Sequence, residues 1–174
     1  MAEKISINRL TNANMYLDGN SLLGKVEEMT LPSVKNKMVE HKALGMNGAL
    51  EFPSGIEKLE GKIKWNSFYG DVLAKMANPY TALQVQVRAS LETYASGGRV
   101  SQVPVVAILT MMPKSLPGGS FKQNDNVEAE TDYTANYFKL TIGGQDIVEV
   151  DVLANIYKVG GVDVLAEYRT NIGG

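Results

Sequence analysis

The sequence predicts a mainly β protein, an antiparallel β-sandwich or barrel with one short flanking helix. Apolar and polar residues alternate strictly along residues 82–92, the period of a half-buried strand. Glycine pairs, such as Gly97-Gly98 and Gly143-Gly144, separate β-compatible segments and suit hairpin turns. Helical signals are scarce, so closely spaced strands with little helix favour an all-β architecture.

The clearest prediction is a long hairpin. Leu83, Val85 and Val87 face one side of the 82–92 strand. The opposite, wet face carries Gln84, Gln86, Arg88, Ser90 and Glu92. After Gly97-Gly98, the almost wholly apolar 103–112 segment predicts a partner strand that is covered on both faces.

A second hairpin is predicted near the C-terminus, where 137–142 and 145–152 flank Gly143-Gly144. The alternating 127–136 segment extends its first strand. Shorter strands are expected at 15–17, 22–26, 29–31, 34–40 and 59–65.

The main helix is predicted at 71–77, which begins with Asp71 and is stopped by Asn78-Pro79. Another helical turn or two is expected at 164–169, with Asp163 as its cap.

All 174 residues form one predicted domain, with residues 41–55 as an extended arm. The arm segment has loop-like glycines and a proline, and so long a loop is usually functional or disordered. Its apolar residues argue against disorder. We therefore expect it to order against another copy of the chain through Leu44, Met46, Leu50 and Phe52.

Composition excludes several classes of protein. Cysteine is absent, which removes disulfides and thiolate chemistry, and the net charge of -2 does not suit tight nucleic-acid binding. No apolar run is long enough to span a membrane, and the N-terminus has no secretion signal. We expect a protein that stays in the cytosol where it is made, without stable membrane association.

The sequence predicts no catalytic, cofactor or metal site. Residues 19–25 match a phosphate-binding G-x-x-x-x-G-K, but Val26 replaces the required hydroxyl and a strand is expected next, so a hairpin turn is favoured. His41 is the lone histidine and is expected to be solvated. The oxygen-rich 124–130 segment lacks the glycine of a calcium loop and favours a solvated turn. The chain is not expected to be an enzyme.

Several segments together resemble the major tail tube protein of contractile-tailed bacteriophages and R-type pyocins. The resemblance runs from about residue 11 to the end, with residues 66–125 matching mainly in pattern. It is carried by Thr11–Gly19, Leu22–Gly24, Thr30–Pro32, Ala43–Gly48, Tyr137–Leu140, Gly144, Val148–Asp151, Gly161–Asp163 and Arg169–Gly173.

The resemblance implies a structural subunit whose hexameric rings join their sheets into an inner β-barrel and stack into a hollow tube. The implied partners are further copies of the chain, the contractile sheath, baseplate and tail terminator proteins, and a tape measure protein in the lumen. The tube would penetrate the cell envelope and conduct DNA transiently and without sequence preference. It would be a virion component assembled in the bacterial cytoplasm. The alternative is the inner tube of a DNA-free, pyocin-like injection particle or secretion tube.

The channel wall is expected among the polar strand faces. Candidate lumen-facing residues are Gln84, Gln86, Arg88, Glu92, Glu128, Glu130 and Asp132. Alternation separates two faces but does not tell which faces the lumen, so the acidic residues also fit a solvated surface. A monomeric β-sandwich that binds sugars or peptides is a further alternative, with little support from aromatic clustering.

Overall fold

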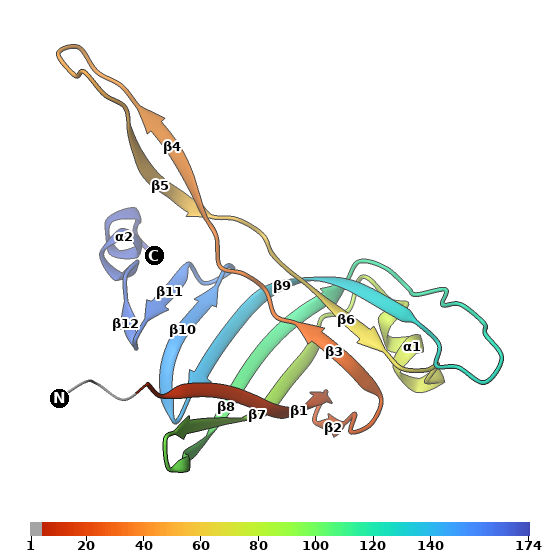
Figure 1. Ribbon diagram of the computed structural model, residues 1–174. Coiled ribbons are helices and arrows are strands. Elements are labelled where there is room, and N and C mark those ends of the chain that lie inside the picture. The colour runs from red at the N-terminus through yellow and green to blue at the C-terminus, as the bar shows by residue number, and fades with distance from the viewer. Residues whose placement is uncertain (1–4) are drawn as a thin grey trace.

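The computed structural model describes residues 5–174 and contains twelve strands and two short helices (Figure 1). The strands are β1 (Ile7–Leu17), β2 (Asn20–Ser21), β3 (Val26–Thr30), β4 (Asn36–His41), β5 (Leu50–Ile56), β6 (Leu59–Trp65), β7 (Leu83–Ala95), β8 (Gly98–Pro113), β9 (Ala129–Ile142), β10 (Gln145–Asp151), β11 (Ile156–Val159) and β12 (Val162–Asp163). The helices are α1 (Gly70–Met76) and α2 (Ala166–Ile172).

Ten strands form one antiparallel sheet in the order β12-β11-β10-β9-β8-β7-β1-β2, and β3 joins it through β6, which pairs with β9. The long hairpin predicted around Gly97-Gly98 is confirmed as β7 and β8, with Val85 opposite Leu109. The second predicted hairpin is confirmed as β9 and β10, and β9 includes the predicted extension back toward residue 129.

The sheet curls around one hydrophobic core. Inward side chains from β1, β6, β7, β8 and β9 belong to a single buried cluster, and α1 adds Val72 and Met76 to it. The fully buried Trp65 donates its indole N–H to Thr131 at 3.0 Å. Since the same face turns inward along the whole curved sheet, the outward faces of β6 and β7 point to different sides of the molecule.

A glycine makes room for the largest buried phenol. Tyr133 lies opposite Gly61 in the β6–β9 pair and donates its hydroxyl to the Thr30 carbonyl at 2.9 Å. A Cβ on Gly61 would lie 2.3 Å from the Tyr133 oxygen and 2.4 Å from the Thr30 oxygen. Burial raises the pKa of Tyr133 well above the ordinary value, so the phenol stays neutral and donating. Tyr133 thus connects β9 to β3 across Gly61 of β6.

The arm stands outside this body. Strands β4 and β5 pair only with each other among the described strands, and Figure 1 shows them projecting from the rest of the chain. Residues 41–55, which the sequence left without a strand assignment, form the tip of this hairpin and most of β5. Residues Leu50–Ile56 form β5, which pairs with β4 from His41 opposite Leu50 to Asn36 opposite Ile56.

Two other local predictions need correction. The strand expected at 22–26 is a turn up to Lys25, because Gly24 adopts a φ of +75° and Leu22 turns inward into the core. The second helix, expected at 164–169 with Asp163 as its cap, is α2; it begins at Ala166 with Leu165 at the N-cap position, and no side chain caps it. Asp163 accepts the Leu165 amide at 3.0 Å and pairs with Arg169 at 2.6 Å, so it fixes the turn before α2.

Candidate assembly surfaces

The outward face of β7 is polar and accessible. Gln84 and Arg88 are exposed and Gln86 is half-buried, whereas the intervening Leu83 and Val85 are buried. Arg88 donates to the Gln86 side-chain carbonyl at 3.1 Å. It forms no ion pair with any carboxylate in residues 5–174, so it leaves a free cation on this face.

The neighbouring strands continue this face with paired charges and apolar groups. On β8, Ile108 lies opposite Gln86. Beyond β8, Lys139 of β9 pairs with Asp146 at 2.8 Å, and Lys158 of β11 pairs with Glu149 at 3.2 Å. The hydrogen bond from Lys139, followed by one from Thr141, lowers the pKa of Asp146. The face therefore carries many charged groups but little net charge.

Glu92 lies on the same face but is covered. Only 6% of the residue is exposed, because the Tyr94 hydroxyl (2.7 Å) and the Arg99 guanidinium (2.6 Å) both donate to its carboxylate. These donors hold the pKa of Glu92 below its ordinary value, with the Tyr94 hydrogen bond the largest cause. The strand period indicated the face correctly. The alternation did not indicate that Arg99, beyond the β7–β8 turn, would fold back and cover Glu92.

The predicted acidic stripe lies at the N-terminal part of β9, where β9 pairs with β6, and is partly neutralised. Glu130 and Asp132 point outward from the part of β9 that pairs with β6, and Lys62 contacts both carboxylates. The hydrogen bond that Lys62 donates to Glu130 is the largest cause of the raised pKa of Lys62. The hydrogen bond that Lys64 donates to Glu27 is the largest cause of the raised pKa of Lys64, and the charge of Glu128, just before β9, adds a smaller effect. The β6 lysines were missed because nothing local in the sequence indicates their partners.

The arm exposes the apolar side chains predicted for it. Leu44 is fully exposed, and Met46, Leu50 and Phe52 are each about half exposed or slightly less. Met38 and Val39 on β4 add to this surface and were not predicted. An isolated two-stranded hairpin is marginally stable in water, so an apolar, projecting one is suited to cover by another protein.

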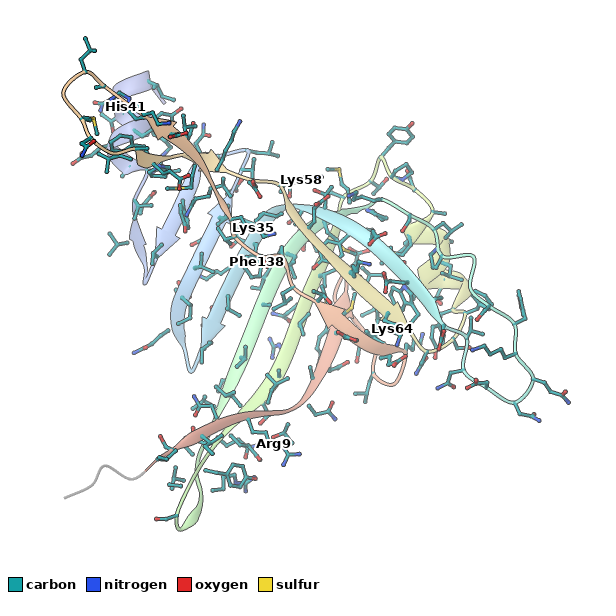
Figure 2. All side chains as sticks on the ribbon, turned by 45° about the horizontal axis from the view of Figure 1, so that its top comes forward. Arg9, Lys35, His41, Lys58, Lys64 and Phe138 are labelled. Carbon is teal, nitrogen blue, oxygen red and sulfur yellow. The ribbon has the colours of Figure 1, made fainter. Side chains whose placement is uncertain are left out.

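Figure 2 shows His41 on the arm, far from Arg9 and Lys64 on the body. Its ring meets that of Phe52 edge-on, with centroids 5.9 Å apart. Within residues 5–174, no group of three or more His, Cys, Asp or Glu side chains is arranged to hold a metal ion.

Gly19 and Gly24 have positive φ angles in turns, and β3 follows them in place of the helix that a phosphate loop needs.

Two apolar edges were not predicted as sites. At one end of the sheet, the N-terminal half of β1 exposes Ile7 and Leu10, and β2 pairs only with Tyr16 and Leu17 of that strand. The Ile5-Ser6-Ile7 alternation was the available signal. At the other end, β11, β12, α2 and the turn before α2 carry exposed apolar residues, namely Val159, Val162, Val164, Tyr168 and Ile172. Among the described helices, none is long and apolar enough to cross a membrane.

Comparison with known proteins identifies the family. The family model of the phage tail tube protein FII matches residues 7–173. The chain belongs to the phage tail tube family. It is 28% identical over 169 residues to the tail tube protein of Escherichia phage P2, covering 95% of this chain and 96% of that protein. It is 26% identical over 147 residues to the major tail tube protein of Serratia phage KSP20, covering 84% of each.

Solved structures support the same tail tube fold. The chain resembles the sheath/tube terminator structure of an extracellular contractile injection system, PVC, with a TM-score of 0.56 and 12% identity over 74% of this chain and 92% of that one. The PVC sheath-tube complex gives the same TM-score and identity over 74% and 87%. As a tail tube protein the chain is a structural virion component and not an enzyme, in agreement with the empty search for catalytic residues.

Proposed function

We propose that this chain is the repeating subunit of a contractile tail tube, in which hexameric rings close through the sheet edges and stack through the arm. The observation that carries the proposal is the pair of uncovered ends on one sheet, β1 at one side and β11–β12 at the other. Unpaired strand edges are usually blunted or covered in proteins that work alone. Joining the two ends of neighbouring copies would extend the sheet around a ring.

The outward face of β7, β8 and β9 is the better-supported channel wall. It lies between the two uncovered ends, so ring closure would carry it around the inside as one surface. The side chains that then contact the lumen are Gln84, Gln86 and Arg88. Glu92 is buried beneath Tyr94 and Arg99 and does not reach the lumen. The stripe of Glu128, Glu130 and Asp132 remains a second candidate, and its ion pairs with β6 also suit an outer surface.

The arm provides contacts along the tube axis. Its apolar residues Leu44, Met46, Leu50 and Phe52 are uncovered in the single chain, and a neighbouring copy is the partner that an assembling protein always meets. The outer surface would contact a sheath protein, and the tube ends would contact baseplate and terminator proteins. A tape measure protein would occupy the lumen during assembly in the host cytoplasm.

DNA that passes through transiently is the favoured cargo of the tube, because both sequence relatives are phage proteins. The channel wall described above is nearly neutral, which limits the phosphate contacts that would hold DNA. A DNA-free injection tube remains the second candidate, favoured by the fold shared with an extracellular contractile injection system.

Electron microscopy of the purified chain at rising concentration tests the assembly. Six-fold rings or hollow tubes are the expected products, with a baseplate or ring template added if nucleation is slow. A uniform monomer under all these conditions would refute the proposal. Replacing Glu128, Glu130 and Asp132 together by Lys tests the second wall: slowed DNA release from intact tubes would move the lumen to that stripe.

A further inference from the structure

The tip of the arm carries Asn47-Gly48, the one Asn-Gly pair in the sequence. The strand pairing of the arm ends at His41 and Leu50, so residues 42–49 form an open loop. Within this loop the Met46 amide donates to the Ala43 carbonyl at 3.2 Å. Neither the Asn47 side chain nor the Gly48 amide forms a hydrogen bond with any part of residues 5–174. A Cβ placed on Gly48 would meet nothing within 4 Å.

This arrangement favours a spontaneous reaction of the backbone. The Gly48 nitrogen attacks the side-chain carbonyl carbon of Asn47, the amide nitrogen leaves as ammonia, and a five-membered succinimide forms. Water then opens the ring at either carbonyl and leaves aspartate or isoaspartate. The reaction needs rotation about the Asn47–Gly48 backbone and an unhindered nitrogen, and glycine supplies both because it has no side chain.

We propose that Asn47 is a deamidation site in the free subunit, and that the product weakens assembly. The second part rests on the proposed function of the arm. One deamidation changes the formal charge from -2 to -3 and places a carboxylate beside Leu44 and Met46. A charge buried in an apolar contact without a partner is costly. Isoaspartate also lengthens the backbone at the tip, so it shifts the neighbouring side chains.

Another asparagine shows what protection looks like in the same chain. Asn66 precedes the small residue Ser67, but its amide group is held at both atoms. The nitrogen donates to the Gly24 carbonyl at 2.6 Å, and the oxygen accepts the Tyr69 hydroxyl at 2.6 Å. These contacts keep the side chain away from the geometry of attack, so Asn66 is a matched internal control.

Tryptic peptides separate the two sites. Cleavage after Lys42 and Lys58 releases residues 43–58, in which Asn47 is the sole side-chain amide. Cleavage after Lys64 and Lys75 releases residues 65–75, in which Asn66 is the sole side-chain amide. A mass gain in either peptide therefore identifies its site, and enzymatic methylation of isoaspartate gives an independent readout.

The free protein and assembled tubes are incubated side by side at mildly alkaline pH. In the free protein, the 43–58 peptide should deamidate on the order of ten times faster than the 65–75 peptide, and Gly48→Ala should remove most of the excess because it restricts the backbone. Equal rates in the two peptides would overturn the proposed site. Tubes should protect Asn47, and Asn47→Asp should raise the concentration needed for tubes. Fast deamidation with normal Asn47→Asp assembly would leave the site standing and refute the role of the arm tip in assembly.

Discussion

Replacing Leu44 by Asp separates folding of the subunit from assembly of the tube. Leu44 is fully exposed at the tip of the arm and contributes nothing to the buried core. Substitutions at such positions usually change the free energy of unfolding by less than about 0.5 kcal/mol. The variant should therefore give a folded subunit with the melting temperature of the parent.

The effect on assembly should be much larger. Burying a leucine side chain in a contact with another copy contributes about 2 kcal/mol. A buried, unpaired polar group adds a penalty of at least about 1 kcal/mol, so Leu44→Asp should weaken each arm contact by about 3 kcal/mol. At 1.4 kcal/mol per tenfold change, the concentration at which tubes form should rise about a hundredfold.

Sedimentation of tubes across a concentration series, with negative-stain images of each pellet, measures this threshold. Tyr80→Asp is the matched control, because Tyr80 is 94% exposed on the connection between α1 and β7 and lies outside the arm. It should leave the threshold unchanged. A Leu44→Asp variant that assembles at the parent concentration would show that the arm tip is not buried in the tube.

Three further changes probe the core, the β7–β8 turn and the channel wall. Gly61→Ala should destabilise the fold by about 2–4 kcal/mol in thermal or urea unfolding, because the new methyl displaces Tyr133, whereas the unhindered Gly97→Ala should not. The pKa of Glu92 is lowered in the fold, so its contribution is present above the ordinary value of 4.5 and is lost as pH falls through the folded value. Glu92→Gln should therefore flatten the acid limb of stability against pH, and an unchanged limb would contradict the buried carboxylate. Gln84→Lys should slow DNA release from tubes of normal length, and normal release would place that face outside the channel.

The fold was largely predictable because its strongest signals are local. Alternation from Leu83 onward and the glycine pairs define β7, β8, β9 and β10, and these strands form the centre of the sheet. Leu22 was misassigned because an apolar pair beside a glycine suits a strand as well as an inward turn. Burial in the core decides between the two, and most residues of the core cluster around Leu22 are remote in the sequence.

The candidate sites were less predictable because they depend on long-range pairing. Lys62 reaches Glu130 across 68 positions of sequence, and this contact offsets part of the charge of the acidic stripe. Arg99 covers the Glu92 carboxylate at the end of the β7–β8 hairpin. The strand register shifts there between Thr93 and Tyr94. Periodicity assigns a residue to a face, but neighbours on that face decide its charge and exposure.

The pairing of charges on the proposed channel wall has a physical consequence of its own. Lys139 with Asp146 and Lys158 with Glu149 are fixed next to one another within the subunit, so their fields largely cancel beyond about a Debye length, roughly 10 Å at moderate salt. A polyanion moving along such a wall meets small alternating potentials and no continuous cationic track. Arg88 forms no ion pair within residues 5–174, and ring symmetry would repeat its positive charge around the wall. Removing it by Arg88→Gln should reduce the salt dependence of DNA release, and an unchanged dependence would show that phosphates do not meet this face.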